Sequence, residues 1–403
     1  MSRSAYKDPF RTARPLYATC DTGMSDLVAA ELTALGAQQV FPGHRGVGFF
    51  GDRQTMVRAN LESRIANRIL LPVAEFPATD RESLYDGVRR VDWSRWFDTG
   101  KTIALDASSN RSELSHTAFM GQVAKDAICD HFRDQTGERP SVDKRAPDVS
   151  INVRVDRDHC IVSLDTSGLR LFRRGYRRES GEAPIKETLA AAILTRCGWA
   201  ADMVLVDPMC GSGTFLIEAA LIATNTAPGW RRATAEGFGF MRLHGHDQEK
   251  FTQYLTELDA QRTPLRPGSI IGTDIDGAIL EVCRRNLDRS RYSHLIGIER
   301  CALHNFKMPA NAADGVRLLI SNPPYGERLG RDEDLVRTYQ QLGDVLRREF
   351  RGGEAGLIMA NDAPKALGLR PELTIPMRNG SIDCHLLRLK LHATPRPPRS
   401  DRR

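Results

Sequence analysis

The stretch that decides the fold reads Val204-Leu205-Val206-Asp207-Pro208-Met209-Cys210-Gly211-Ser212-Gly213-Thr214. Its apolar start predicts a buried strand, which ends in an acid, turns through small residues and leads into a helix over residues 215–223. Glycines allow a backbone to approach a ligand closely, and the first N–H groups of a helix point towards such a ligand. The stretch therefore predicts a cofactor-binding turn.

Strands of the same kind follow this turn. Apolar runs cover residues 269–272, 317–320 and 355–360, and glycine turns and helices separate them. Strands that are buried on both faces and alternate with helices indicate a doubly wound parallel sheet. We therefore expect an α/β domain over residues 182–392.

The second strand of this sheet is expected to end at Asp274, where an acid can accept hydrogen bonds from ribose hydroxyls. Dinucleotide folds place this acid about 20 residues after the first glycine turn, whereas the gap here is far longer. We therefore predict an insertion over the cofactor or substrate side, with a loop at residues 228–245 and a helix at 247–262, and not a plain NAD fold. Asp276 either contacts the ligand or caps the following helix.

The third motif is Asn322-Pro323-Pro324-Tyr325, directly after the run at 317–320. The exocyclic amine of a base is a poor nucleophile because its lone pair is delocalised into the π system. The Asn322 side-chain oxygen and the Pro323 carbonyl could accept its two hydrogens and so turn the lone pair towards a methyl donor. The prolines stiffen the loop, and Tyr325 offers a face on which a flipped base can stack.

The first part of the chain, residues 16–168, has a different pattern. Helices are expected at 25–35 and 116–132, and alternating apolar residues at 151–155 and 160–164 predict an antiparallel hairpin. Helices beside alternating strands indicate an α+β module with one sheet face covered.

An arginine-rich segment at residues 169–181 joins the two parts. Its arginines are interleaved with two aromatic residues: Arg170, Arg173, Arg174, Arg177 and Arg178 with Phe172 and Tyr176. Guanidinium groups match phosphate oxygens and aromatic rings stack on bases, so this composition suits RNA. The alternative is a solvated linker whose arginines pair with neighbouring acids.

The composition bounds the class of protein. A chain of 403 residues with 41% hydrophobic residues and a net charge of +6 suggests two or three globular domains with mild basicity. No apolar run approaches the roughly 20 residues of a membrane-spanning helix, and the first residues do not form a secretory signal. Eight cysteines without a Cys-x-x-Cys pair indicate neither a zinc site nor a disulfide framework, which favours a reduced cytoplasmic compartment.

The motifs together resemble a known family. The likeness lies in RRGYR (173–177), APIKETLAAAIL (183–194), DPMCGSGTFLIEAALIAT (207–224) and SNPPYGERLG (321–330). Residues 207–214 together with 322–325 are similar to the class I methyltransferases that modify exocyclic amines. The flanking sequence resembles the bacterial 23S ribosomal RNA guanine-N2 methyltransferase L family over nearly the whole chain.

This resemblance implies an α/β fold, with a Rossmann-like class I methyltransferase domain preceded by an α+β ferredoxin-like/THUMP RNA-binding module. It implies a ferredoxin-like segment at 1–54, a THUMP domain at 55–168, an arginine-rich linker at 169–181, the methyltransferase domain at 182–392 and a disordered basic tail at 393–403. The implied reaction is transfer of a methyl group from S-adenosyl-L-methionine to guanine N2 of large-subunit ribosomal RNA, in the cytoplasm and with no metal or membrane partner.

The expected site residues fall into three groups. Those for the cofactor are Asp207, Met209, Cys210, Gly211, Ser212, Gly213, Thr214, Asp274, Ile275 and Asn305; those for the amine are Asn322, Pro323, Pro324 and Tyr325; those for RNA are Arg173, Arg174, Arg177 and Arg178. Relatives often carry an Asp where this chain reads Cys301-Ala302-Leu303-His304, so Asn305 or a backbone group would replace that contact to adenine. Some relatives fuse a second methyltransferase half, whereas this chain stops at Arg403, so only the guanine-N2 activity is implied.

Two other functions fit the same residues. The chain could be a non-catalytic RNA-binding factor of ribosome assembly with a vestigial pocket, since the Asp near Ala302 is missing. It could also methylate another planar amine, such as adenine N6, a glutamine amide or guanine N2 of transfer RNA, because the same loop serves any of them. The expected partner is large-subunit ribosomal RNA or a pre-ribosomal particle.

Overall fold

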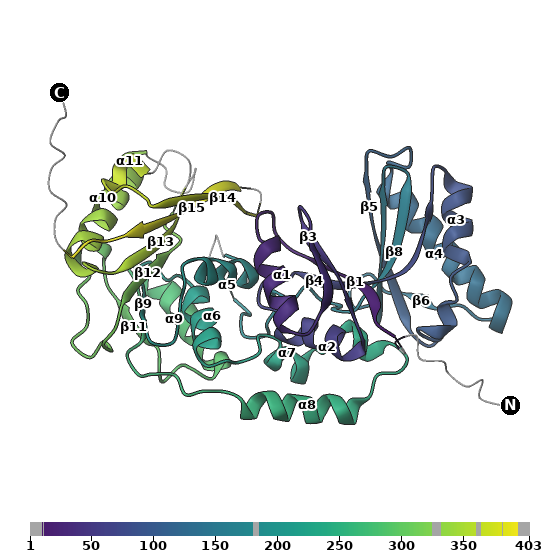
Figure 1. Ribbon diagram of the computed structural model, residues 1–403, viewed down its shortest axis with the longest axis horizontal. Coiled ribbons are helices and arrows are strands. Elements are labelled where there is room, and N and C mark those ends of the chain that lie inside the picture. The colour runs from purple at the N-terminus through teal and green to yellow at the C-terminus, as the bar shows by residue number, and fades with distance from the viewer. Residues whose placement is uncertain are drawn as a thin grey trace. The chain divides into compact units, whose positions relative to one another are not determined.

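The chain folds into two compact units. The computed structural model describes residues 10, 12–179, 185–324, 332–359, 364–380 and 382–393 (Figure 1). One unit comprises Met1–Leu171 and Gly229–Thr256, and the other comprises Phe172–Pro228 and Glu257–Arg403. Tyr325 of the third motif and the expected tail at 394–403 lie outside the described residues.

The N-terminal unit is built on one mixed sheet whose strand order is β2-β3-β1-β4-β8-β7-β5-β6. The strands are β1 Arg14–Thr19, β2 Gln38–Pro42, β3 Gly46–Gly51, β4 Arg68–Pro77, β5 Thr102–Asn110, β6 Ser141–Val142, β7 Val149–Asp156 and β8 His159–Asp165. The hairpin expected at 151–164 is confirmed: β7 and β8 pair in antiparallel fashion around a turn at Arg157 and Asp158.

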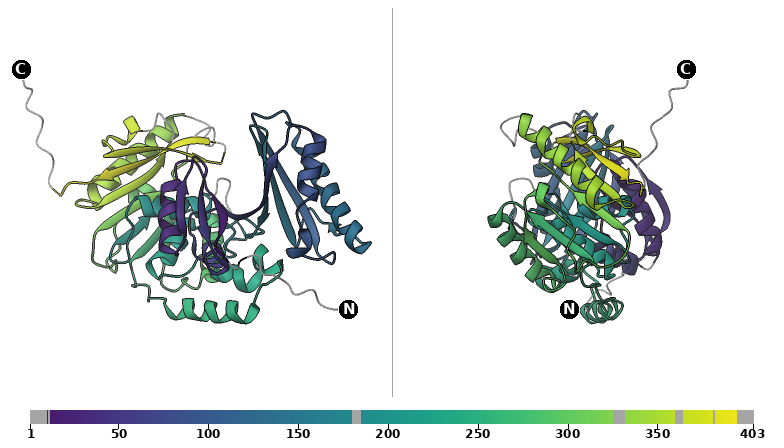
Figure 2. Two further views of the ribbon diagram at one scale, coloured as in Figure 1. Left: turned by 45° about the vertical axis from the view of Figure 1, so that its right-hand side comes forward. Right: turned by 90° about the vertical axis from the view of Figure 1, so that its left-hand side faces the viewer.

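Helices cover this sheet and supply its core. They are α1 Ser25–Ala34, α2 Arg53–Glu62, α3 Arg81–Arg89, η1 Trp93–Arg95 and α4 Thr117–Thr136. The His116 side chain accepts a hydrogen bond from the N–H of Phe119 at the start of α4, and Gly137 ends the helix in the left-handed conformation. Figure 2 shows α3 and α4, the two blue helices, together on one face of the blue strands. The expected α+β module with one covered face is confirmed.

The long insertion between the first two strands of the second unit's sheet packs with the N-terminal unit. It contains α7 Trp230–Ala235, η2 Gly239–Arg242 and most of α8 Gln248–Ala260. The sequence predicts a loop and a helix inserted at this point, and the structure packs residues 229–256 of the insertion with the N-terminal unit. The segment's hydrogen bonds go to the end of the β8 region, as the Phe240 N–H that donates to the Thr166 carbonyl shows.

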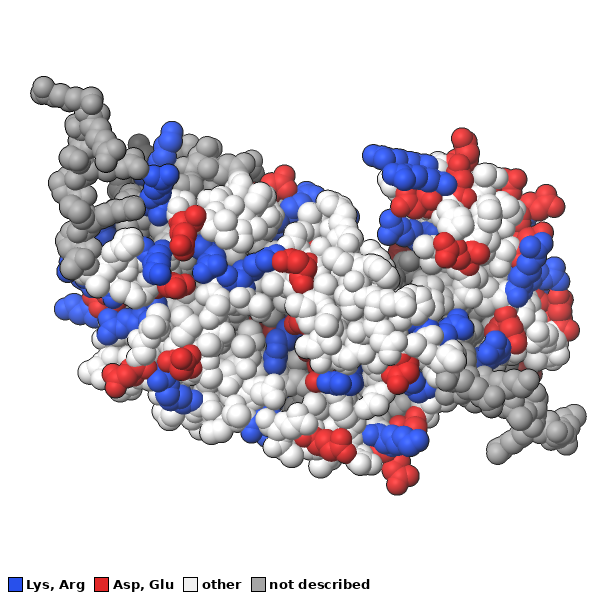
Figure 3. Space-filling view, in the orientation of Figure 1, with Lys and Arg blue, Asp and Glu red and all other residues white. Residues whose placement is uncertain are grey.

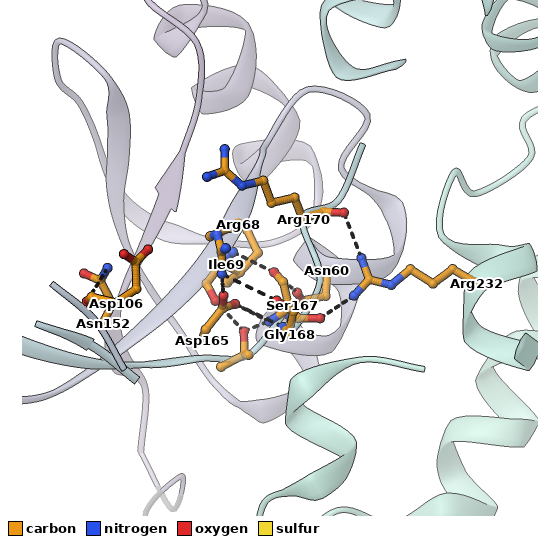
Figure 4. A network of polar contacts seen from close by, with 11 residues as sticks. Asn60, Arg68, Ile69, Asp106, Asn152, Asp165, Ser167, Gly168, Arg170 and Arg232 are labelled. Carbon is orange, nitrogen blue, oxygen red and sulfur yellow. Dashed lines mark hydrogen bonds and ion pairs between the residues drawn. The ribbon is translucent and has the colours of Figure 1, made fainter. Parts of the chain in front are cut away.

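Arg232 fastens this insertion to the exit of β8 (Figure 4). Its side chain is 1% exposed and donates hydrogen bonds to the carbonyl oxygens of Ser167, Arg170 (3.2 Å) and Gly237 (3.0 Å). Its guanidinium also lies 4.6 Å from the centre of the Phe238 ring. Several acceptors and an aromatic face thus satisfy a cation that is otherwise costly to bury.

Asp165, the last residue of β8, fixes the residues that follow it through a second set of polar contacts. Its carboxylate is ion-paired with Arg68 and accepts hydrogen bonds from the N–H groups of Ser167 (2.9 Å) and Gly168 (3.1 Å) (Figure 4). Asn60 completes the network, because its amide donates to the Thr166 hydroxyl and accepts from the Ser167 hydroxyl. Residues 165–168 are therefore hydrogen-bonded both to α2, through Asn60, and to the insertion, through Arg232.

The second unit has a seven-stranded sheet of order β11-β10-β9-β12-β13-β15-β14. The strands are β9 Val204–Asp207, β10 Ile270–Asp274, β11 Gly297–Arg300, β12 Arg317–Ser321, β13 Glu354–Met359, β14 Leu373–Asn379 and β15 Ile382–Lys390. The first five are parallel, and the apolar runs predicted four of them but not β11; β15 is antiparallel to both of its neighbours. This reversed strand distinguishes the sheet from the dinucleotide fold, whose order is 3-2-1-4-5-6.

Helices lie on both faces of this sheet, as expected for a doubly wound fold. They are α5 Glu187–Arg196, α6 Thr214–Ala223, α9 Gly277–Ser290, α10 Asp332–Glu349 and α11 Pro364–Leu367, with η3 Leu303–Asn305 between β11 and β12. The helix α10 packs Leu342, Val345 and Leu346 against β9, β12 and β13 in one continuous apolar core. The α/β fold with a preceding α+β module is confirmed.

Replacing Arg232 with Ala should destabilise the N-terminal unit by about 3 kcal/mol, because buried carbonyl oxygens would lose their donor. Urea unfolding of the full chain at several wavelengths would resolve this unit's transition. Arg242→Ala is the matched control: Arg242 lies in the same insertion, is 55% exposed and is 3.9 Å from Asp148, so its loss should cost less than about 1 kcal/mol. Equal losses in the two variants would contradict the fastening role of Arg232.

Candidate functional site

The turn after β9 has the geometry that its glycines predicted. Gly211 and Gly213 both have positive φ angles, 53° and 84°, and α6 begins directly after Gly213. A Cβ atom on Gly213 would lie 2.6 Å from the sulfur of Cys283, so a larger residue does not fit. Cys210 is buried, and its N–H donates to the Thr273 carbonyl of β10. The turn is therefore tight, close to its neighbouring strand and open at the start of α6.

Asp207 ends β9 in a buried position, with 2% of its surface exposed. One oxygen, Oδ1, accepts hydrogen bonds from the Ser321 hydroxyl (2.8 Å) and the Met209 N–H (3.2 Å). Burial, together with a smaller contribution from the nearby charge of Asp274, raises the pKa of Asp207 to about 7. The carboxyl can therefore change its protonation near neutral pH, and a cationic ligand would favour its charged form.

Asp274 at the end of β10 fastens two loops at once. Its carboxylate accepts hydrogen bonds from the N–H of Gly211 (2.9 Å) and from the N–H of Asp276 (3.0 Å). The Asp276 side chain in turn accepts from the N–H of Ala278 at 2.8 Å, so Asp276 is the N-cap of α9, which decides between the two roles left open. Ile275 between the two acids is 64% exposed, which leaves an apolar surface beside the turn.

The third strand ends close to Asp274. The N–H of Cys301 donates to the Asp274 carbonyl, and Asn305 closes the short helix η3 just beyond. The Asn305 side chain is exposed, as is that of His304. The segment 301–305 therefore lies beside the carboxyl end of β10, where the missing Asp of relatives was expected.

The third motif begins where β12 ends. Asn322 is half-buried and Pro323 is buried. The carboxamide oxygen of Asn322 is inaccessible to solvent and has no hydrogen-bond partner among the described residues. A buried acceptor without a donor is rare, because leaving it unsatisfied costs free energy. The end of β12 therefore presents an acceptor that a bound ligand could use.

These three motifs meet at one edge of the sheet. The strands β10, β9 and β12 are adjacent and parallel, so their carboxyl ends lie side by side. From β9 the chain continues to β10 and β11 on one side of the sheet and then crosses to β12 on the other side of β9. The strand order therefore reverses between β9 and β12. Open α/β sheets bind ligands at this point. The Ser321–Asp207 hydrogen bond joins the two strands there.

Two of the four arginines expected to contact RNA are internal. Arg174 is 2% exposed, and its Nε lies 3.5 Å from the buried carboxylate of Glu218, which also accepts a hydrogen bond from the Tyr176 hydroxyl. The prediction that Arg174 contacts phosphate is wrong, because its guanidinium compensates a buried acid. Arg173 and Arg178 are exposed.

Arg177 is the second internal arginine, and it ties two helix starts together. Its guanidinium donates to Glu187 at 2.6 Å, to the Ile185 carbonyl at 2.8 Å and to the Thr214 hydroxyl at 3.3 Å. Burial raises the pKa of Glu187 to about 7, although Arg177 opposes that rise. Arg174 and Arg177 thus pair with acids, but not as the solvated linker that we named as the alternative. The acids are buried helix residues rather than linker neighbours, so the arginine pattern alone did not reveal them.

The surface charge is dispersed. Figure 3 shows lysines and arginines interspersed with acids on the face that it presents, in keeping with a net charge of only +6. The described residues contain no group of three or more His, Cys, Asp or Glu that could hold a metal ion. Among the helices in the described ranges, none combines the length and apolar character needed to cross a bilayer.

Three family descriptions match the chain. An RlmL ferredoxin-like domain matches residues 15–70, a THUMP domain matches 78–165, and an RMKL-like, methyltransferase domain matches 174–388, more than half of the chain. The chain belongs to the RMKL-like methyltransferase family. This membership confirms the family resemblance and the fold class predicted from the motifs.

Individual relatives of this methyltransferase are similar over most of its length. The ribosomal RNA large subunit methyltransferase K/L of Methylococcus capsulatus is 43% identical over 93% of this chain and 50% of its own. A candidate RNA methyltransferase of Synechocystis is 39% identical over 94% of this chain and 98% of its own. The crystal structure of SMU.472, a candidate methyltransferase in complex with SAH, has a TM-score of 0.85 and 31% identity, covering 96% of this chain and 100% of SMU.472. The chain thus spans about half the length of the K/L relative.

Replacing Arg177 with Gln should lower the free energy of unfolding of the methyltransferase unit by about 3 kcal/mol, because Glu187 would remain buried without its cation. Calorimetric unfolding of the full chain would measure the loss. Arg173→Gln, a change of the same kind at an exposed neighbour, should shift the transition by less than about 0.5 kcal/mol. A stable Arg177→Gln protein would mean that the pair is not needed at the helix starts.

The raised pKa of Asp207 predicts a pH-dependent stability of the ligand-free protein. Between pH 4 and 7 the unfolded chain ionises this carboxyl while the folded chain keeps it protonated, so the free energy of unfolding falls as pH rises. Asp207→Asn removes this contribution. Urea unfolding at pH 4, 5, 6 and 8 should show wild type losing about 3 kcal/mol relative to the variant across that range. A constant difference between the two proteins would rule out the raised pKa.

Proposed function

We propose that this protein transfers the methyl group of S-adenosyl-L-methionine to the exocyclic N2 amine of a guanine in large-subunit ribosomal RNA. The family membership and the SAH complex of SMU.472 support the cofactor. The THUMP match and the names of the K/L relatives support a ribosomal RNA substrate. The guanine N2 position is what the motif resemblance implies.

The residues around β9 fit this cofactor. Gly211 and Gly213 carry no Cβ that would block it, and the start of α6 offers N–H groups to its amino-acid carboxylate. Asp274 would accept hydrogen bonds from the ribose, and the exposed Ile275 offers an apolar face for the adenine. When bound, S-adenosyl-L-methionine supplies a methyl group activated by a positive sulfonium. The buried Asp207 is the acid placed to balance that charge.

The observation that carries the proposal is the Asn322 oxygen, which has no hydrogen-bond partner within the part of the chain that the structure describes. A buried acceptor at the end of β12 suits an N–H donor, and a guanine amine has two hydrogens to donate. With one hydrogen on Asn322 Oδ1 and the other on the Pro323 carbonyl, the amine nitrogen would lose conjugation and turn its lone pair out of the ring plane. Fixed acceptors of this kind act on the transition state and need no reorganisation.

The RNA contacts would come from exposed basic side chains. Of the four arginines expected to contact RNA, Arg173 and Arg178 are exposed. Since phosphate contacts supply position rather than base choice, they would orient the RNA while Asn322 and its loop hold the amine. Free ribosomal RNA and an assembling particle are both substrates to test.

The direct test is labelled methyl transfer by the full chain to ribosomal RNA from cells that lack this enzyme, followed by nucleoside analysis. We expect a single N2-methylguanosine in the large-subunit RNA. Replacing Asn322 with Ala should lower turnover by about 10²–10³-fold, the size of effect seen when one fixed polar group of a transition-state site is removed. Cofactor affinity, measured by calorimetry, should stay within about two-fold, because Asn322 acts on the amine.

Asn311→Ala provides the control for loss of an exposed asparagine in the same unit, and it should leave turnover unchanged. If the labelled nucleoside were N6-methyladenosine, methylation of an exocyclic amine would stand, but guanine as the substrate base would be rejected. If the protein bound the cofactor but methylated neither free ribosomal RNA nor the assembling particle, the ribosomal substrate would be rejected. Loss of cofactor binding in Asn322→Ala, with no separate effect on turnover, would reject the role of its side chain.

A further inference from the structure

The described part of the loop after β12, residues 322–324, is held on both sides by side-chain hydroxyls. At its start, the Ser321 hydroxyl donates to Asp207 at 2.8 Å. At its end, the Tyr339 hydroxyl donates to the carbonyl oxygen of Pro324 at 3.0 Å. Ser321 is fully buried and Tyr339 is 4% exposed, so water does not compete for either bond. Neither residue belongs to the motif at 322–325, which we propose binds the amine.

The sequence of the loop explains why it needs such bonds. Pro323 and Pro324 have no backbone N–H, so two of the three residues in the segment 322–324 cannot donate a main-chain hydrogen bond. Proline restricts rotation about its own φ angle but does not attach the loop to the rest of the fold. The attachment must therefore come from side chains that reach the loop from outside.

Tyr339 is well suited to hold the loop because its ring is fixed. It lies on α10, in the same apolar core as Leu342, Leu346 and the sheet residues of β9 and β12. A packed aromatic ring has few accessible rotamers, so the position of its hydroxyl follows from the packing of α10. The bond to Pro324 therefore transmits the position of the core to the loop.

Ser321 has a different position, between the cofactor side and the amine side. It is the last residue of β12, and its hydrogen bond runs across to the last residue of β9. The acceptor at Asn322 is thus one residue away from a direct link to Asp207. The distance between the acid and the amine acceptor is set by this link, and not only by the strand pairing.

We propose that Ser321 and Tyr339 are positioning residues that fix the Asn322 and Pro323 oxygens relative to the bound cofactor. The inference rests on the proposed function, since it assigns their effect to the methylation of an amine. A misplacement of about 1 Å at a reacting centre can lower a rate by about 10²-fold. Each hydroxyl therefore acts on turnover through the loop, without touching the substrate.

The test for Tyr339 compares Tyr339→Phe with Tyr292→Phe in the full chain. Tyr292 is 5% exposed in the same unit, and its hydroxyl bonds to Thr224 and Thr226, away from the loop. Both variants lose one buried hydroxyl and keep the ring. We expect Tyr339→Phe to lower kcat by about 10- to 100-fold with the Kd of S-adenosylhomocysteine within about two-fold, and Tyr292→Phe to keep kcat.

A purely structural role of Tyr339 would give equal kcat values in the two variants once their thermal stabilities match, and that result would overturn the inference. The same holds for Ser321→Ala against Ser269→Ala. Ser269 is also buried but lies before β10, at the opposite end of the sheet, where its hydroxyl donates to the Arg266 carbonyl. Ser321→Ala should lower kcat and Ser269→Ala should not.

Hydrogen–deuterium exchange of the peptide that contains Asn322 gives a second readout that needs no RNA. Exchange should be faster in Tyr339→Phe and Ser321→Ala than in wild type, and unchanged in the two control variants. Unchanged exchange in all four would overturn the inference whatever the substrate is. If wild type fails to methylate RNA but exchange differs between wild type and the variants as expected, the proposed function alone is rejected. If Asn322→Ala lowers turnover and Tyr339→Phe does not, the positioning role alone is rejected.

Discussion

Burial of the Asp207 carboxyl is the constraint on which the rest of the methyltransferase site depends. A carboxyl at the end of a central strand cannot be solvated, so the fold must supply its hydrogen bonds, and it does so from Ser321 and from the Met209 N–H. These two donors fix the end of β12 and the first residues of the glycine turn. The glycine turn after β9 and the loop after β12 are thereby built around one atom, Asp207 Oδ1, so a change in the acid affects both.

Buried charge also organises the regions around the site. Arg174 and Arg177 neutralise Glu218 and Glu187, and so fix the starts of α5 and α6. In the N-terminal unit, Arg232 has the same kind of role towards main-chain carbonyls. In each case an arginine joins segments that are distant in sequence. The geometry of its planar group suits this, because it can donate to several acceptors at once.

Local patterns predicted the elements of this fold well. The apolar runs located four of the five parallel strands within one or two residues, and the alternation at 151–164 located the hairpin, because both patterns report burial. The largely exposed β11 has no apolar run and was not located. Such patterns could not report pairing over distance. Nothing near Arg177 indicates Glu187, and nothing near Pro324 indicates Tyr339, since these contacts follow from how the elements pack. The packing partners of the insertion could not be predicted for the same reason: Ser167 and Arg170 lie far upstream.

The shared construction of the N-terminal unit affects its synthesis. The polypeptide passes from that unit into the methyltransferase unit after Leu171, returns at Gly229 and leaves again after Thr256. During translation the sheet of the N-terminal unit emerges well before the segment that Arg232 anchors to it. At about 5–20 residues per second, the segment Gly229–Thr256 is synthesised on the order of ten seconds after the rest of the unit. Through that interval the carbonyls at the exit of β8 remain open to water or to a chaperone, and the nascent methyltransferase strands have begun to appear.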